Sequence, residues 1–196
     1  GYCLVLGAGN GQLAYELARK TGMQVIAVAE PGQDGGPTRE ALRQAGLYGR
    51  VVVHQAPLKQ LGYASELFNL ICVDRASADG SPPTPLAETH RLLRPAGGVA
   101  VMNPQVTSNL TQKALRAWAR PLPADAVQRF EDEQKRFVLR RTPSKGLGDW
   151  THMYAGAANT ACSQDQLVRG ELQLRWYGRP GPQHMVDRHH RTSPPL

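Results

Sequence analysis

Apolar residues gather in five short runs in the first half of the chain, each followed by polar or turn-forming residues. The runs occupy residues 3–6, 23–29, 51–53, 68–73 and 99–102. Short runs rich in Val, Ile and Leu are typical of strands buried on both faces of a sheet. Between them, apolar residues recur at helical spacing in residues 12–18, 39–45 and 86–94. The alternation predicts an α/β fold, a Rossmann-like and mostly parallel sheet with helices on both faces.

The pattern changes after residue 103. A helix is expected after Ser108, with Leu110, Ala114, Leu115 and Trp118 on its apolar face. A second helix is expected from Ala124 to about Lys135. A late strand is expected at Phe137 to Arg141. Because Pro, Gly and Ser follow, we predict one domain over residues 1–145 and an irregular C-terminal extension over residues 146–196.

A glycine-rich segment joins the first predicted strand to the first helix. It reads Gly7-Ala8-Gly9-Asn10-Gly11. Glycines at such a turn allow a nucleotide-like ligand to approach bare backbone N–H groups. A dinucleotide fingerprint would place its third glycine at position 12, where this chain has Gln12. The spacing therefore disfavours a nicotinamide-dependent oxidoreductase.

An acidic residue follows the second predicted strand. Glu30 lies 19 residues after Gly11, about the interval at which a carboxylate accepts hydrogen bonds from ribose hydroxyls. The alternative is a solvated acid at a strand end, and we favour the ribose interpretation. Because the strands are parallel, their carboxyl ends also present His54 with Gln55, and Asp74.

Together these segments resemble the class I S-adenosylmethionine-dependent methyltransferases over Gly1 to about Met102. The resemblance rests on the glycine segment, Glu30, Phe68-Asn69-Leu70-Ile71 and Arg91-Leu92-Leu93-Arg94-Pro95-Ala96-Gly97-Gly98. It implies S-adenosylmethionine as cofactor, held by Gly7, Ala8, Gly9, Asn10, Gly11, Glu30, Gln55 and Asp74. It implies methyl transfer to an acceptor that the sequence does not identify.

The chain departs from the family at two positions. The family usually has an acid two residues before the first glycine, where this chain has Val5, and often an aspartate after the third strand, where it has His54-Gln55. Gln55 can hydrogen-bond an adenine edge but carries no charge. No catalytic residue is assigned, although His54 and Asp74 are candidates for a base. An active enzyme and a non-catalytic interaction module both fit these departures.

A second resemblance covers Asp149 to about Tyr177. Asp149-Trp150, then Gly156, Asn159-Thr160 and Ser163, and later Leu174-Arg175-Trp176 resemble the opening of pyrroloquinoline-quinone-type β-propellers. The resemblance implies a propeller domain in the same polypeptide, because one partial blade cannot form a propeller. The chain also lacks an initiator Met, and we expect it to be a fragment of a larger protein.

Charge and metal-ligand chemistry change this interpretation little. The net charge is +7, and Lys and Arg outnumber acids by 9 to 8 in residues 1–103 and by 14 to 8 afterwards. The late arginines are scattered among Pro and Gly, so we do not expect nucleic-acid binding. The cluster His184, Asp187, His189 and His190 is interpreted as solvated rather than as a metal site. No apolar run approaches the ~20 residues of a membrane span, and the three cysteines leave the compartment open.

Overall fold

The computed structural model describes residues 1–104, 107, 109–120, 136–149, 151–152 and 154–167, and the backbone of residues 127–131. The chain divides into two compact units, Gly1–Pro143 and Ser144–Leu196. The first unit contains all the helices and strands that the described residues form. Each unit is described by itself.

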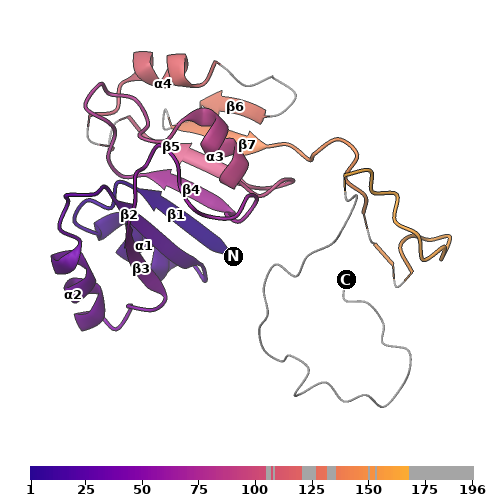
Figure 1. Cartoon of the computed structure of the whole chain (residues 1–196), viewed down its shortest axis with the longest axis horizontal. Coiled ribbons are helices and arrows are strands. Elements are labelled where there is room, and N and C mark those ends of the chain that lie inside the picture. Colours follow the sequence, from indigo (N-terminus) through magenta and orange to yellow (C-terminus); the bar gives the residue numbers. More distant parts are fainter. Residues whose placement is uncertain are drawn as a thin grey trace. The chain divides into compact units, whose positions relative to one another are not determined.

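The first unit is built on a seven-stranded sheet of order β3-β2-β1-β4-β5-β7-β6. Strands β1 to β5 run parallel, whereas β7 pairs antiparallel with β5 and β6 antiparallel with β7 (Figure 1). The strand bounds are β1 Tyr2–Leu6, β2 Gln24–Ala29, β3 Val51–Gln55, β4 Leu70–Val73, β5 Val99–Met102, β6 Val127–Glu131 and β7 Phe137–Arg141. The prediction of a mostly parallel, Rossmann-like sheet is confirmed.

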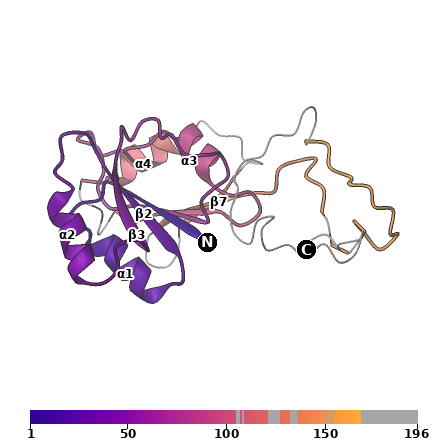
Figure 2. The same ribbon diagram turned by 60° about the horizontal axis from the view of Figure 1, so that its bottom comes forward.

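Helices lie on both faces of this sheet, α1 and α2 on one and α3 and α4 on the other (Figure 2). Their bounds are α1 Gln12–Lys20, α2 Gly36–Gln44, α3 Leu86–Leu92 and α4 Gln112–Trp118. Two apolar clusters form the core, one on each face. Alternate residues of the central strand β1 supply the two clusters; Leu4 and Leu6 belong to one, and Cys3 and Val5 to the other.

One predicted helix is wrong. Val127 and Phe130 are three residues apart, a spacing that fits a helix, and we expected one from Ala124 to Lys135. Residues 127–131 instead form β6, paired with β7 from Val127↔Arg141 to Glu131↔Phe137. The antiparallel pairing of β6 with β7 overrides the helical spacing, because strand formation depends on the neighbouring strand as well as on the local sequence. Residues 121–126 and 132–135 lie outside the described part of the chain.

Two helix starts also differ from expectation. The helix expected after Ser108 begins at Gln112, and the hydroxyl of Thr111 accepts a hydrogen bond from the N–H of Ala114 at 3.2 Å. Ser108 lies outside the described residues. The second helix begins at Gly36 with Pro37 in its first turn, a position that tolerates proline because its N–H would have no partner there.

The second unit contains little regular structure among residues 144–149, 151–152 and 154–167. It has one isolated antiparallel bridge, His152↔Ala155. The N–H of Gly148 donates to Asp165 at 3.0 Å, and that of Gln166 donates to the carbonyl of Gly146 at 2.8 Å. Trp150 and residues 168–177 of the propeller-like segment lie outside the described residues, as does the cluster from His184 to His190.

The described residues contain no disulfide, no cluster of metal ligands and no membrane-spanning helix. Cys3 and Cys72 lie in strands as expected, and Cys162 is exposed; all three are free thiols. Within the described residues, no group of three or more His, Cys, Asp or Glu side chains could hold a metal ion. The helices in the described part of the chain are too short or too polar to span a bilayer.

Candidate functional site

The carboxyl ends of four neighbouring strands bring the predicted site residues to one edge of the sheet. Leu6 pairs with Val28 on one side and with Val73 on the other. Gly7 and Asp74 therefore follow adjacent strands, and Glu30 follows Ala29, the register partner of Gln55. Across the sheet the order is Gln55, Glu30, the glycine segment and Asp74. This edge is the usual ligand-binding edge of an open parallel sheet.

The glycine segment has a fixed and unusual backbone. Gly7, Gly9 and Gly11 have φ of 73°, 50° and 81°, in the left-handed region that favours glycine. The N–H groups of Gly7 and Ala8 both donate to the carbonyl of Val28, at 3.0 and 2.9 Å. The segment is thereby tied to the end of β2.

Two N–H groups of this segment remain available. That of Gly11 donates to the carbonyl of Ala8 at 2.8 Å, and that of Gln12 donates to Oδ1 of Asn10 at 3.0 Å. Within the part of the chain that the structure describes, the N–H groups of Gly9 and Asn10 have no hydrogen-bond partner. Both residues are exposed, so these donors can meet a ligand at the start of α1.

The Asp74 carboxylate lies directly over the glycine segment. A Cβ added at Gly9 would lie only 2.5 Å from Oδ2 of Asp74. Burial raises the pKa of Asp74, and the neighbouring positive charge of Arg75 opposes this shift. A half-buried carboxylate is thus held where a ligand cation could contact both it and the backbone of Gly9.

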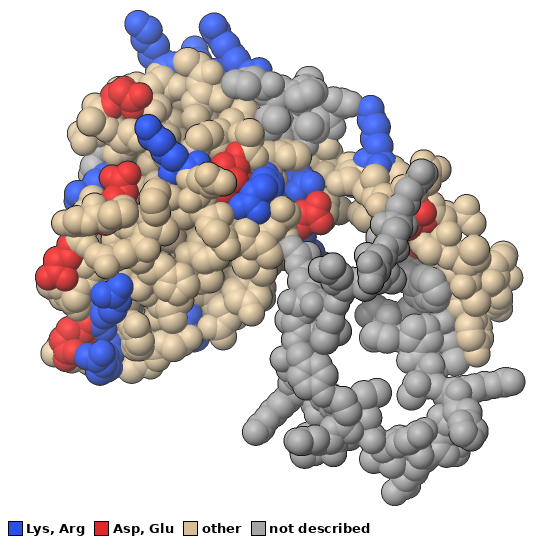
Figure 3. Space-filling view, viewed as in Figure 1, with Lys and Arg blue, Asp and Glu red and all other residues tan. Residues whose placement is uncertain are grey.

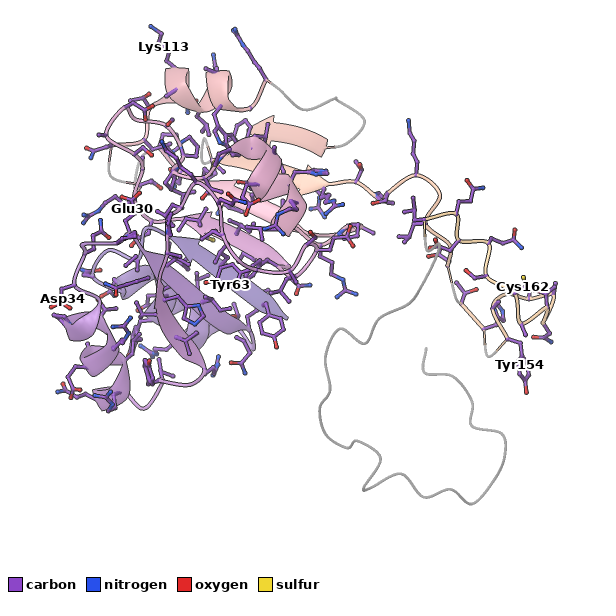
Figure 4. The ribbon with its side chains drawn as sticks, in the orientation of Figure 1. Glu30, Asp34, Tyr63, Lys113, Tyr154 and Cys162 are labelled. Carbon is purple, nitrogen blue, oxygen red and sulfur yellow. The ribbon has the colours of Figure 1, made fainter. Side chains whose placement is uncertain are left out.

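Glu30 and Gln55 lie at the next two strand ends, and within the described residues only the Gln55 side chain has a hydrogen-bond partner. Glu30 is exposed at the start of the turn into α2 (Figure 4). Its side chain makes no hydrogen bond with the described residues, whereas its carbonyl accepts one from the N–H of Gln33 at 3.1 Å. Nε2 of Gln55 donates to the carbonyl of Gln33 at 2.5 Å. This leaves Oε1 of Gln55 and the whole carboxylate of Glu30 for a ligand.

His54 pairs with Tyr63, a residue that no sequence motif identified. Its Nδ1 lies 2.8 Å from the hydroxyl of Tyr63, and the two rings are stacked with centroids 5.9 Å apart. Burial raises the pKa of Tyr63 to about 12. No hydrogen bond joins His54 to the glycine segment among the described residues. The geometry therefore brings Asp74, and not His54, to the glycine segment.

The arginine of the Arg91–Gly98 motif has a bracing role that sequence reasoning missed. Arg91 donates to the carbonyls of Tyr63 and Leu61 at 2.8 and 2.9 Å and forms an ion pair with Glu88 at 2.7 Å. Glu88 also accepts a hydrogen bond from the N–H of Leu61 at 2.9 Å. This network lowers the pKa of Glu88 and fixes the loop that carries Tyr63. The Glu and Arg three residues apart on one predicted helix were the available signal.

Thr38 precedes the helix expected over residues 39–45 and lies instead inside α2, where it is buried. Its methyl group packs on the glycine segment, since a Cβ added at Gly11 would lie 2.5 Å from Cγ2 of Thr38. A hollow of about 210 Å³ opens beside this contact, between α1 and α2. Gly11 is therefore required by packing as well as by its backbone angle.

Charged side chains of both signs lie on the visible face of the first unit. Figure 3 shows acidic and basic side chains interspersed over the visible face of that unit. Several pair within one helix, including Lys20 with Glu16 and Arg43 with Glu40. Such pairs are worth little individually, and they give that face no single-sign field.

Comparison with solved structures supports the fold. A Methanococcus maripaludis protein assigned as an S-adenosyl-L-methionine-dependent methyltransferase matches with a TM-score of 0.59 and 15% identity, covering 74% of this chain and 78% of its own. A Galdieria sulphuraria protein assigned as a sarcosine dimethylglycine methyltransferase matches at 0.45 and 25%, covering 52% and 38%. Geranyl diphosphate C-methyltransferase from Streptomyces coelicolor, solved with Mg²⁺, geranyl diphosphate and S-adenosyl-L-homocysteine, matches at 0.45 and 16%, covering 52% and 38%.

The chain spans less than half of the length of the last two proteins. No protein-family model and no curated protein matches the chain. The likeness to the Methanococcus maripaludis protein shows that the first unit has the fold of the Rossmann-like methyltransferases.

Proposed function

We propose that the first unit binds S-adenosylmethionine at the carboxyl edge of the sheet and transfers its methyl group to an acceptor. The observation that carries the proposal is the pairing of the glycine segment with Asp74. The N–H groups of Gly9 and Asn10 have no partner among the described residues and can donate to the carboxylate of an amino-acid moiety, and the Asp74 carboxylate over Gly9 can accept from its ammonium. Solved proteins of this fold are described with S-adenosylmethionine or its product bound.

Asp74 fills a role that the family usually gives to an acid in the first strand. Val5, at that position, is fully buried in the apolar cluster beneath α1 and cannot contact a polar ligand. Asp74 lies at the end of β4, the neighbour of β1, and its carboxylate approaches the same loop from the other side. We assign to it the ammonium of the methionine moiety.

The remaining site residues would hold the adenosine. The exposed carboxylate of Glu30 can accept hydrogen bonds from two ribose hydroxyls, and Oε1 of Gln55 can accept one from the adenine amino group. Nε2 of Gln55 is held by Gln33, so the orientation of this amide is already set. These two residues lie on neighbouring strand ends, as a nucleoside requires.

The chemistry needs little from the protein besides alignment. S-adenosylmethionine carries its methyl group on a sulfonium and so supplies the driving force for in-line displacement when bound. The residues at this edge bind and orient it: the glycine segment and Asp74 hold one end, and Glu30 and Gln55 hold the other. Alignment of the acceptor is then the main contribution to the rate.

Calorimetric titration of the full chain tests the binding step. S-adenosylmethionine or S-adenosylhomocysteine should bind, and either should bind more tightly than NAD. Gly9→Val should abolish binding because its side chain would fill the space between Gly9 and Asp74. Gly46→Val is the matched control, since Gly46 also has positive φ but has no atom within 4 Å of an added Cβ. Binding of NAD alone, or of no ligand at millimolar concentration, would refute the proposal.

A second candidate function is a non-catalytic interaction module within a larger propeller protein. Val5 and the absence of an aspartate after β3 favour it, because both weaken the usual cofactor contacts. The propeller-like segment from Asp149 to Tyr177 belongs to this proposal, as does a domain boundary near residues 145 and 146. Sequencing of the parent gene tests it: propeller blades downstream of Tyr177 would support it, and an unrelated or absent continuation would exclude it.

A further inference from the structure

A second hollow lies close to the cofactor edge and has no role in the proposal above. Its volume is about 460 Å³, within the range of small-molecule pockets. It is lined by Lys59, Ser77, Ala78, Asp79, Ser81, Pro82, Pro83, Pro85 and Trp118. Its wall begins at Ser77, three residues after Asp74, on the segment that leaves the carboxyl end of β4. Because Ser77 is three residues from Asp74, their Cα atoms lie within about 11 Å of one another, and the hollow begins near the same end of β4.

The hollow has a fixed frame. Thr84, fully buried, donates from its hydroxyl to the carbonyl of Leu58 at 2.7 Å, and its own carbonyl accepts the indole N–H of Trp118 at 2.8 Å. One residue thus joins the loop that carries Lys59, the proline-rich loop before α3, and helix α4. The N–H of Thr111 donates to the carbonyl of Gly80 at 3.0 Å and ties the start of α4 to the same loop. Such a frame can present side chains in a reproducible geometry.

Apolar and charged groups are separated within the hollow. Pro82, Pro83, Pro85 and Trp118 form an apolar wall, and the indole is held edge-on to Phe137 with ring centroids 6.4 Å apart. Lys59 and Asp79 are exposed at the rim. A ligand with an apolar body and a polar end fits this division.

The two rim charges line the same hollow and form no ion pair with each other in the described part of the chain. Oδ1 of Asp79 accepts hydrogen bonds from the N–H and the hydroxyl of Ser81, at 3.0 and 2.6 Å, and Oδ2 has no partner among the described residues. The hydrogen bonds from Ser81 lower the pKa of Asp79, and the charge of Lys59 contributes a smaller part. Lys59 itself makes no ion pair or hydrogen bond with the described residues. Two exposed charges of opposite sign on the lining of one hollow favour a ligand that itself carries both signs.

We infer that this hollow binds the methyl acceptor, and that the acceptor is an apolar molecule with adjacent ammonium and carboxylate groups, as in an amino acid with an apolar side chain. That the ligand is a methyl acceptor rests on the proposed methyl transfer. Binding of such a ligand in the hollow does not depend on it. The carboxylate pairs with Lys59, the ammonium pairs with Asp79, and the apolar side chain lies on the proline and tryptophan wall.

Three probes with one apolar body and different charges test this assignment on the full chain. They are L-phenylalanine, 3-phenylpropionate and 2-phenylethylamine, titrated by ligand-observed NMR. L-Phenylalanine should bind most tightly, by about two- to fivefold over each of the others, as expected for exposed charge pairs. Lys59→Gln should remove its advantage over 2-phenylethylamine, and Asp79→Asn its advantage over 3-phenylpropionate. Lys113→Gln, an exposed lysine on α4 that does not line this hollow, should change neither.

The outcomes separate this inference from the proposed function. Equal affinities for the three probes, preferences unchanged in both rim variants, or no binding at all would overturn the assignment of the hollow, even if S-adenosylmethionine binds. Retention of L-phenylalanine binding in Gly9→Val, which should lose S-adenosylmethionine, would support a separate acceptor site. If L-phenylalanine binds and S-adenosylmethionine binds neither variant nor wild type, the hollow stands and methyl transfer fails.

Discussion

Replacing Gly9 by alanine tests whether the glycine segment and Asp74 form one site. Gly9 has φ of 50°, a backbone conformation that is unfavourable for any residue with a side chain. The cost is about 1–2 kcal/mol. The new Cβ would also lie 2.5 Å from Oδ2 of Asp74, which forces that carboxylate out of its present rotamer. Such a displacement adds about 0.5–1.5 kcal/mol.

Gly46→Ala isolates the backbone part of this cost. Gly46 has φ of 68° and is exposed, as Gly9 is, but nothing lies within 4 Å of an added Cβ. Urea unfolding followed by circular dichroism should give a loss for Gly46→Ala near the backbone cost alone. Gly9→Ala should lose about 0.5–1.5 kcal/mol more, the displacement of Asp74 being the difference.

A double-mutant cycle attributes this difference to Asp74. In an Asp74→Ala background the contact with the added methyl group is gone, so the cost of Gly9→Ala should fall to that of Gly46→Ala. Calorimetry on the same proteins should show cofactor affinity lost in Gly9→Ala and retained in Gly46→Ala. Equal costs for the two glycine variants, or a Gly9→Ala cost unchanged by removal of Asp74, would refute the reasoning.

Three further expectations concern the same unit. Glu30→Ala should weaken S-adenosylmethionine binding at least tenfold with little change in Tm, since each charge-assisted hydrogen bond to a ribose is worth about 1.5–3 kcal/mol; a large drop in Tm with unchanged affinity would assign Glu30 to the scaffold. Asp74→Asn should raise Tm at neutral pH, because burial raises the pKa of Asp74 above its ordinary value of 3.8 and its ionised form therefore opposes folding. The gain should vanish below pH 3.8, whereas a pH-independent change would contradict burial as the cause. Limited proteolysis should cut near Lys145 and leave a stable core that ends before it; a protected junction would contradict the predicted boundary.

The sheet was predictable because its signals are local. The runs around Val5, Val28 and Val53 are apolar and β-branched, and each is bounded by polar or glycine-rich residues, so the parallel sheet could be predicted without tertiary information. Strand β6 could not be, because its conformation depends on pairing with β7 and its own spacing of Val127 and Phe130 fits a helix. Local periodicity fails where a partner strand determines the conformation.

The sequence was sufficient to predict which residues lie at this edge of the sheet, but not which of them contact one another. The strand ends identified the glycine segment, Glu30, Gln55 and Asp74 as residues of one edge. That Asp74 lies over Gly9 follows from the adjacency of β1 and β4, which no pattern in either strand encodes. The support of Tyr63 by Arg91 likewise joins residues 28 positions apart through backbone carbonyls, which carry no signal in the sequence.

The antiparallel course of β7 determines where the chain enters and leaves the first unit. Arg141, at the end of β7, donates its N–H to the carbonyl of Gly98, just before β5 begins, so it lies at the amino edge of the sheet together with Gly1. Its guanidinium is anchored there on the carbonyls of His90 and Leu93 and on Glu66. Gly1 and Arg141 therefore both lie at the edge of the sheet opposite the glycine segment. A surface or reporter attached at this edge of the first unit would leave the glycine segment facing away from the attachment, which suits tethered-ligand and single-molecule measurements.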